Sequence, residues 1–246
     1  MKILITGASS GIGKALAEIL CKDNEIIAVA RSQEKLEILQ KATNCKTEVC
    51  DISDSNQCKT LFEKHNDIDV LINNAGFGDL GYFNKTDLEK EINMINTNIT
   101  GLHLLTKMYL DVMMKRNSGY ILNVSSVASF FPGPLMATYY ATKAYVTNLT
   151  KAICYELKKQ KSDVYIGVLC PGPVDTNFNK VANCKFNLKS QTPEKVAEIA
   201  VKNMFKKKKV ICTSFAVKLA RIGSKLLPDS LLCRLAFISQ KKKYHR

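Results

Sequence analysis

Short apolar runs rich in β-branched residues recur along the 246-residue chain, separated mostly by longer stretches with apolar residues at helical spacing. Near-continuous apolar runs of this length are typical of strands buried on both faces of a parallel sheet. They lie at residues 2–6, 26–30, 68–72, 120–124, 164–170 and 209–213, and a further, more polar strand is expected at residues 46–50. Their alternation with helical stretches predicts an α/β fold with about seven parallel strands flanked by helices.

Length and composition favour a single domain. The 246 residues suffice to bury one large core, and the chain has no internal repeat and no linker rich in Pro, Gly or Ser. We expect residues 1–213 to form the domain that carries the sheet, the cofactor and the active site. We expect residues 214–246 to add a basic amphipathic helical tail, packed on the same domain.

The positive charge of the chain is concentrated near its C-terminus. Residues 181–246 contain 16 Lys or Arg and 3 Asp or Glu, and so carry +13 of the total formal charge of +14. Apolar residues are interspersed with these charges between Phe215 and Ile238, in stretches too short and too charged to span a bilayer. Three interpretations stay open: a helix packed across a cleft or a subunit interface, a helix on an anionic membrane surface, or non-specific attraction to nucleic acid without a recognition motif.

A glycine-rich turn follows the first predicted strand, and a helical stretch over residues 14–20 follows the turn. Dinucleotide-binding folds hold a pyrophosphate in this order of elements, because glycines permit close backbone approach and the helix N-terminus supplies positive potential. The candidate cofactor-binding residues are Gly7, Ser9, Ser10, Gly11, Ile12 and Gly13. With the parallel strands they predict a Rossmann-type doubly wound sheet. A glycine turn without a ligand is the alternative.

The second predicted strand ends at Arg31, where an acidic residue would bind the ribose 2′-hydroxyl of NAD. Because an arginine can instead pair with a 2′-phosphate, the sequence favours NADP, with NAD as the alternative cofactor. A solvated surface arginine would give the same pattern.

The next two strand ends add cofactor candidates. Asp51 and Ile52 follow the third predicted strand, where the carboxylate could accept from an adenine amino group or cap the next helix. Asn74, Ala75 and Gly76 follow the fourth, where close packing against a cofactor and a simple turn are both compatible with the sequence.

Tyr139 and Lys143 lie four residues apart in a helical stretch, thirteen and seventeen residues after Ser126. One helical turn places the lysine on the face of the tyrosine, where its charge favours the phenolate and lowers the tyrosine pKa. The Ser126 hydroxyl can then hold the carbonyl or alcohol oxygen that exchanges the proton. Tyr140 is not the candidate, because the residue four positions later is Ala144. A half-buried tyrosine beside a solvated lysine is the alternative for this pair taken alone.

Taken in order, these motifs resemble the classical short-chain dehydrogenase/reductase family, over roughly residues 2–213. The resemblance implies a hydride transfer between a nicotinamide and a carbonyl carbon, with Tyr139 as general acid or base and Lys143 lowering its pKa. It implies that Ser126 fixes the substrate oxygen and that Asn98, the family's catalytic asparagine, supports a water linked to Lys143. The segment implied to contact the nicotinamide contains Pro171, Gly172, Val174 and Thr176. Lys143 would also hold the nicotinamide ribose.

Two apolar segments are expected to wall the substrate site at the carboxyl ends of the strands. One covers residues 127–136, with Phe130, Phe131 and Met136, and the other follows Thr176 through Phe178, Val181 and Phe186. They predict a small hydrophobic carbonyl substrate, although these side chains would also suit an ordinary core. The family resemblance further implies a homodimer or a homotetramer.

The nine cysteines form no Cys-x-x-Cys motif, and the three histidines lie far apart in sequence, so no metal site is predicted. The odd cysteine count and the absence of a signal peptide favour a cytoplasmic protein, with the basic tail leaving a peripheral membrane location open. Two functional alternatives remain beside a carbonyl reductase. They are a membrane-surface reductase of lipid-derived carbonyls and a catalytically idle NADP-binding regulatory protein.

Overall fold

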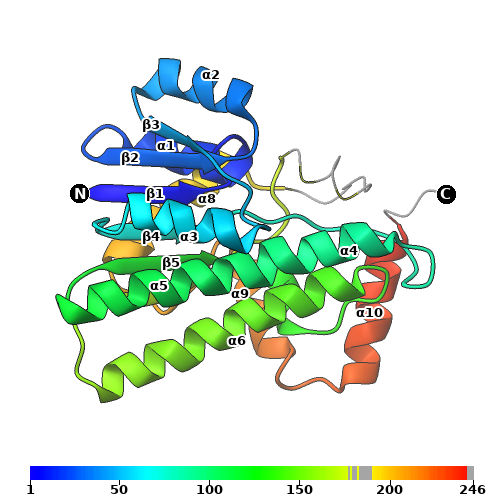
Figure 1. The fold of residues 1–246 in the computed structure, drawn as a ribbon. Helices are drawn as coiled ribbons and strands as arrows, with labels where there is room; N and C mark the ends of the chain where they lie inside the picture. The colour runs from blue at the N-terminus through cyan, green and yellow to red at the C-terminus, as the bar shows by residue number, and fades with distance from the viewer. Residues whose placement is uncertain (177, 179–181, 183–189, 243–246) are drawn as a thin grey trace.

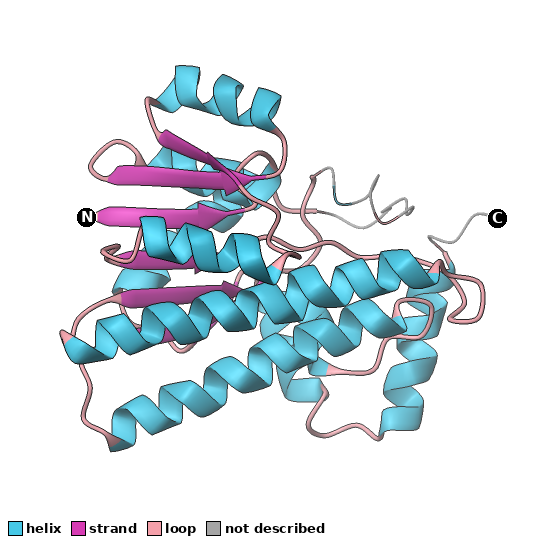
Figure 2. Cartoon of the chain, in the orientation of Figure 1, coloured by secondary structure: helices cyan, strands magenta, loops and turns pink. Residues whose placement is uncertain are grey.

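In a computed structural model, which describes residues 1–176, 178, 182 and 190–242, seven parallel strands form one sheet (Figures 1 and 2). The strands run β1 Lys2–Thr6, β2 Glu25–Ala30, β3 Lys46–Val49, β4 Val70–Asn73, β5 Tyr120–Val124, β6 Tyr165–Cys170 and β7 Val210–Cys212. Their spatial order is β3-β2-β1-β4-β5-β6-β7. The predicted parallel α/β sheet is therefore confirmed, with boundaries that differ from the prediction by one or two residues.

Alternate residues of each central strand enter different hydrophobic cores. Ile3 and Ile5 of β1 belong to one cluster of buried residues, whereas Leu4 between them belongs to another. The same alternation holds in β2, because side chains of successive strand residues point to opposite faces. Two apolar faces need two layers of helices, so the uninterrupted apolar runs in the sequence lead directly to a three-layer architecture.

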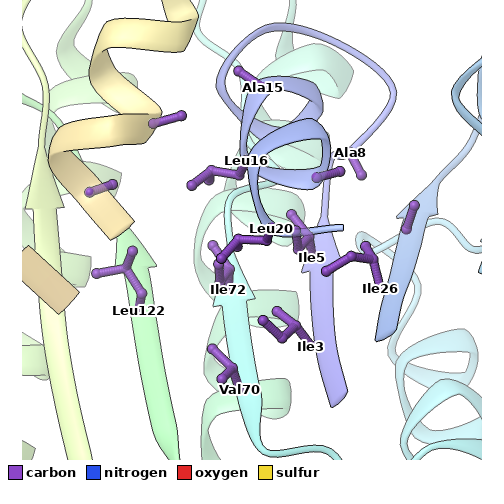
Figure 3. Close-up of a cluster of buried hydrophobic side chains, with 14 of the residues drawn as sticks. Ile3, Ile5, Ala8, Ala15, Leu16, Leu20, Ile26, Val70, Ile72 and Leu122 are labelled. Carbon is purple, nitrogen blue, oxygen red and sulfur yellow. The ribbon is translucent and has the colours of Figure 1, made fainter. Parts of the chain in front are cut away.

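The first face is covered by α1 Gly11–Leu20, α2 Gln33–Thr43 and α8 Pro193–Phe205. Figure 3 shows Leu20 of α1 beside the strand side chains Ile72 and Ile5, and Leu16 of α1 belongs to the same buried cluster. Burying a leucine side chain of this kind contributes about 1.5–3 kcal/mol. Helix α1 is therefore fixed along the sheet, and its N-terminus stays at the carboxyl end of β1.

The second face is covered by α3 Ser55–Lys64, α5 Leu102–Lys115 and α6 Ala137–Lys159. A π-helical segment, η1 Asn96–Gly101, joins α4 Leu88–Ile95 to α5 without an intervening loop. A short 3₁₀ helix, η2 Val127–Phe130, lies between β5 and α6. Because α6 begins soon after β5 ends, the first turns of α6 are held near the carboxyl edge of the sheet.

The basic C-terminal stretch forms two helices, α9 Phe215–Gly223 and α10 Asp229–Lys241. Leu232, Ala236 and Gln240, spaced by one helical turn, make the buried side of α10, which lies near the N-terminal ends of α4 and α6 (Figure 1). None of the helices in the described residues is long and apolar enough to cross a membrane. The proposed division at residue 213 stays a prediction.

The strand order reverses direction between β1 and β4, since the chain first builds outward through β2 and β3 and then returns to the other side of β1. In open α/β sheets, ligands bind outside the carboxyl ends of the strands at such a reversal. The carboxyl ends of β1 and β4 lead into Gly7 and Asn74, two of the residues singled out from the sequence.

Candidate active site

A cleft of about 450 Å³ opens at the carboxyl edge of the sheet, where the strand order reverses. Most of the residues chosen from the sequence line it. They are Gly7, Ser9, Ser10, Gly11, Ile12, Arg31, Asp51, Ile52, Asn74, Ala75, Gly76, Ser126, Tyr139, Lys143, Pro171, Gly172, Val174 and Thr176. The two remaining candidates, Gly13 and Asn98, do not line the cleft but contact residues that do.

The glycine turn has the geometry of a cradle that a side chain would fill. Gly7 and Gly11 have φ values of 66° and 54°, a region that favours glycine. A Cβ on Gly11 would lie 2.9 Å from Thr176 Cγ2, and one on Gly13 would overlap the carbonyl oxygen of Gly7. No side chain caps the N-terminus of α1, so its first amides are available to an anion. These residues fit a dinucleotide pyrophosphate.

Asn74 holds the glycine turn in place rather than acting as a simple strand end. Its backbone N–H donates to Thr6 Oγ1 at 3.0 Å, and its Nδ2 donates to the carbonyl oxygens of Thr6 and Gly7 at 3.0 and 3.2 Å. The side chain thus ties β4 to the turn after β1. Ala75 and Gly76 continue this segment along the floor of the cleft.

A positively charged corner lies where β2 ends and α2 begins. Arg31 is exposed and lines the cleft, with its Nη1 3.8 Å from Asp51 Oδ2. Ser32 caps α2, and Lys35 from the first turn of α2 also lines the cleft. The corner combines two cations with a helix N-terminus, a combination that suits a phosphate group.

Asp51 does not cap the helix that follows it. Its Oδ1 accepts from Ser53 N at 2.9 Å and from Ser53 Oγ at 2.8 Å, while Asp54 accepts from the first amides of α3. This geometry removes the capping alternative for Asp51. The side chain lines the cleft beside Ile52.

Lys143 is a buried amine at the centre of the site. Its Nζ donates to the carbonyl oxygen of Val124 at 3.0 Å and lies 5.9 Å from the centre of the Tyr139 ring. Burial disfavours the charged form and lowers the pKa of Lys143 to about 8. A solvated lysine, the alternative considered from sequence, is therefore excluded.

Tyr139 and Ser126 reach the same cleft from α6 and from the end of β5. Tyr139 is buried, and its ring centre lies 5.3 Å from that of Phe178. Ser126 Oγ accepts from Ala128 N at 3.1 Å and so caps η2. The neighbouring Ser125 has a structural role, because its buried Oγ donates to the carbonyl oxygen of Lys143 at 2.9 Å.

Asn98 lies in the π-helical segment η1 and has no exposed surface. Its amide donates to the Phe77 carbonyl oxygen at 2.9 Å and to Thr142 Oγ1 at 3.0 Å, and its Oδ1 accepts from Phe77 N at 3.1 Å. A Cβ on Gly76 would lie 2.9 Å from Asn98 Oδ1 and 3.2 Å from Lys143 Nζ. Asn98 therefore lies behind the surface of the cleft, near the Lys143 amine. The π-helical turn is the local irregularity that points the Asn98 side chain in this direction.

The remaining wall of the cleft is mainly apolar, formed by Met136, Tyr140, Phe178 and Phe77, with Gln240 from α10 among them. Phe130 instead packs into a separate core cluster. The predictions for Val181 and Phe186 lie outside the described residues.

Phe131, a predicted wall residue, stands behind another side chain. Its ring centre lies 5.8 Å from that of Tyr140, and it is not among the residues that line the cleft. Phe131 therefore supports the wall indirectly, whereas Met136 and Phe178 form part of it.

Sequence reasoning missed several residues of the cleft, among them Lys35, Tyr140 and Gln240. Lys35 follows Arg31 by four residues, the spacing of one helical turn, and this spacing could have indicated that the two cations lie close together. Gln240 Nε2 donates to Tyr140 Oη at 2.6 Å across 100 residues of sequence. A contact between residues so far apart in sequence cannot be predicted from a local sequence pattern.

Comparison with known proteins identifies the family. A family model described as short chain dehydrogenase matches residues 1–185. An NADP-dependent 3-hydroxy acid dehydrogenase of Schizosaccharomyces pombe is 34% identical over 237 residues, covering 85% of this chain and 88% of that protein. An uncharacterised oxidoreductase of the same organism is 32% identical over 180 residues, and the match spans 61% of its length and 72% of this chain.

A solved structure has the same fold. The short-chain dehydrogenase of Sphingobium yanoikuyae in complex with NADPH superposes with a TM-score of 0.81 over 94% of each chain, at 24% identity. The chain belongs to the short-chain dehydrogenase family, whose members are oxidoreductases that act on CH–OH groups with a nicotinamide cofactor. The resemblance inferred from the sequence motifs is thereby confirmed.

Proposed function

We propose that the protein is an NADP(H)-dependent oxidoreductase that interconverts a hydrophobic carbonyl and its secondary alcohol. The observation that carries the proposal is the convergence of Tyr139, Lys143 and Ser126 on one cleft, beside a glycine turn that fits a pyrophosphate. The name of the relative that is 34% identical, an NADP-dependent 3-hydroxy acid dehydrogenase, supports both the cofactor and the alcohol.

The cofactor would be held by the glycine turn at its pyrophosphate, by Asp51 and Ile52 near its adenine, and by the segment from Pro171 to Thr176 at its nicotinamide. When bound, the nicotinamide supplies or accepts the hydride, and the protein contributes orientation and electrostatics.

The proton is handled by residues of this chain. Tyr139 Oη would donate to the carbonyl oxygen in reduction and accept from the alcohol in oxidation. Lys143, when protonated, favours the phenolate of Tyr139 through its positive charge. Ser126 Oγ would fix the substrate oxygen next to Tyr139, and Asn98 would fix the hydrogen-bonding environment of Lys143 from the far side of Gly76.

A preference for NADP over NAD rests on the corner built by Arg31, Ser32 and Lys35. Two cations and the first amides of α2 suit a 2′-phosphate of charge near −2, whereas an uncharged 2′-hydroxyl gains little from them.

The substrate class rests on the apolar wall. Met136 and Phe178 offer surface to a hydrocarbon group next to Tyr139. The Tyr140–Gln240 pair places a polar point in that wall. We therefore propose a ketone or aldehyde with a hydrophobic substituent.

The proposal also covers the assembly of the protein and its location in the cell. Exposed apolar side chains on α4 and α6, including Ile92, Tyr145 and Tyr155, support a homodimer or homotetramer formed through these helices in the cytoplasm. The exposed apolar and basic side chains of α9 and α10 support the second candidate, a reductase that works on lipid-derived carbonyls at a membrane surface.

Oxidation of NADPH, followed at 340 nm with a panel of hydrophobic ketones and aldehydes, tests this function. Tyr139→Phe should lower kcat by at least about 100-fold, the usual range for a lost general acid, while cofactor affinity stays within about threefold. Tyr155→Phe on the exposed side of α6 is the matched control and should retain wild-type turnover. Substantial turnover by Tyr139→Phe would refute the acid–base role. Absence of turnover in the wild type, with NADPH bound, would favour an idle cofactor-binding protein.

A further inference from the structure

A second cavity of about 440 Å³ lies between α9 and the edge strand β7, apart from the catalytic cleft. Its lining residues are Val210, Cys212, Lys218, Arg221, Ile222, Lys225 and Leu226. None of them lines the cleft that holds Tyr139. The cavity thus belongs to no function described above.

Three cations of this cavity come from the region of α9, where Lys218, Arg221 and Lys225 follow one another at intervals of three and four residues. Lys218 and Arg221 lie one turn apart on α9, and Lys225 lies in the turn that follows the helix. A fourth cation, Lys151 of α6, lies close enough for Arg221 and Lys225 to act on it. Burial and then these two positive charges hold the pKa of Lys151 below its usual range.

Among the residues that the structure describes, no carboxylate forms an ion pair with this cluster. In the described part of the chain, none of the four cations takes part in an ion pair. Like charges gathered at one site repel one another, and the repulsion is relieved when an anion binds among them. The cavity therefore has the electrostatics of an anion site.

The rim of the cavity is apolar and exposed. Ile222 and Leu226 line it with 57% and 77% of their surface exposed. Phe215 and Leu219 of α9, 72% and 52% exposed, lie on the same helix. A ligand that covers this surface needs an anionic group and hydrocarbon side by side.

Helix α10, which follows α9 in the chain, carries exposed apolar residues of its own. Its exposed large apolar residues are Leu231, Leu235 and Ile238. The described residues of the α9–α10 region contain a single carboxylate, Asp229, against six Lys or Arg. A basic face with exposed Leu, Ile and Phe is typical of helices that lie in the interface of an anionic bilayer.

We propose that the α9–β7 cavity binds the phosphate of an anionic phospholipid, and that it docks the protein on a bilayer with the apolar side chains of α9 and α10 among the acyl chains. Nucleic acid would satisfy the cations but would leave Phe215, Leu219 and Leu226 uncovered. A second copy of this chain that docked through the same face would bring its own Lys218, Arg221 and Lys225 to a surface that is already positively charged.

Docking on a bilayer would bear on the catalytic cleft, because α10 belongs to both sites. Its buried side sends Gln240 into the cleft, and Leu231 and Leu235 on its other side belong to the docking face. If the protein is the carbonyl oxidoreductase proposed above, the cleft would lie beside a source of lipid-derived carbonyls. The docking itself does not depend on that activity.

Co-sedimentation of the full chain with vesicles tests the headgroup site. The protein should bind vesicles of phosphatidylcholine with 20 mol% phosphatidylglycerol at about 0.1 M salt, and it should not bind pure phosphatidylcholine. The variant Lys218→Gln/Arg221→Gln/Lys225→Gln should need about 100-fold more anionic lipid for half-binding, since each cation near a surface contributes about 1 kcal/mol. The control Lys22→Gln/Lys41→Gln/Lys59→Gln removes the same charge from exposed positions elsewhere and should shift binding less than about threefold.

The apolar part of the proposal has its own variant. Ile222→Ser/Leu226→Ser keeps every charge and changes only exposed side chains, so its circular dichroism should match the wild type. It should weaken vesicle binding at least about tenfold, because two buried aliphatic side chains are lost from the interface.

Four outcomes would overturn the proposal: no binding of the wild type to anionic vesicles, equal losses in the cavity variant and its charge-matched control, no loss in the apolar variant, or calorimetric binding of glycerol phosphate at the cavity without any vesicle binding. Light scattering that shows a dimer abolished by Ile222→Ser/Leu226→Ser would assign the face to a second copy instead. Since Tyr139→Phe should bind vesicles as the wild type does, failure of catalysis and failure of docking are separate results.

Discussion

Arg31 and Lys35 illustrate how single residues set the proposed cofactor preference. Both line the same corner of the cleft, and Arg31 also faces the carboxylate of Asp51 at 3.8 Å. The contact with the Asp51 carboxylate positions the guanidinium of Arg31 and does not neutralise the charge of Lys35. A phosphate at this corner would therefore meet a cation on two sides.

Arg31→Ala/Lys35→Ala should raise the Kd for NADP by about 100-fold and the Kd for NAD by less than about threefold. Each charge-assisted contact is worth about 1.5–3 kcal/mol, and NAD has no 2′-phosphate to lose it. Fluorescence titration with both cofactors gives the two constants, and Lys41→Ala on the last turn of α2 is the control. Equal losses for NADP and NAD would show that this corner does not read the phosphate.

At the scale of elements, the site depends on where α6 begins and where α10 ends. The first turns of α6 carry Tyr139, Tyr140 and Lys143, and the buried side of α10 carries Gln240. The contact of Gln240 Nε2 with Tyr140 Oη at 2.6 Å joins the two helices. The C-terminal helix is thus part of the wall of the cleft.

Gln240→Leu and Tyr140→Phe should each shift substrate preference in the same direction. Both remove polarity from the wall at nearly constant volume, so kcat/KM for all-hydrocarbon ketones should rise about tenfold relative to ketones with a second oxygen. The double variant should add little to either single change, because the two side chains form one hydrogen bond. Independent, additive effects on the ratio would contradict a shared role.

At the scale of the whole molecule, the buried amine of Lys143 makes stability depend on pH. Its pKa of about 8 in the native protein lies below the ordinary value of 10.5. Between these two values the unfolded chain holds a proton that the native protein has released. The free energy of unfolding contributed by this group therefore rises with pH across this window, by about 3 kcal/mol in total.

Lys143→Met removes this dependence. Urea denaturation at pH 7.5 and pH 10, without cofactor, should show the wild type gaining about 2–3 kcal/mol on the variant as the pH rises. The comparison uses the change in the difference, because the variant also loses the hydrogen bond to Val124 at both pH values. A difference that stays constant with pH would mean that Lys143 is not a buried, readily deprotonated amine.

Local sequence was sufficient to predict the sheet and many of the residues that line the cleft. Apolar runs predicted the inner strands, since a strand buried on both faces must be apolar throughout, whereas the edge strand β3, Lys46–Val49, contains Lys and Glu and has no buried residue. The glycine turn could be recognised from the sequence because only glycine tolerates the φ values of Gly7 and Gly11 and the close approach of the backbone at Gly13. Tyr139 and Lys143 could be recognised as a pair because one helical turn places their side chains on the same face of the helix.

Contacts that only the tertiary structure creates could not be predicted from the local sequence. Phe130 and Phe131 are neighbours in sequence, yet one packs into a core cluster and the other against Tyr140, because η2 ends between them. Asp51 and Asp54 are both candidates to cap α3, and only the backbone path assigns the cap to Asp54.

The sequence by itself determined the parallel sheet, the position of the glycine turn and the spacing of the candidate catalytic pair Tyr139 and Lys143, because each depends on a periodicity or a spacing within a few residues. Tertiary structure alone decided the burial of Lys143, the contact of Gln240 with Tyr140, and the gathering of Lys151 with three cations of the α9 region. These properties arise from elements that are remote in sequence. Desolvation, long-range hydrogen bonding and charge repulsion depend on distances in space, which local pattern does not contain.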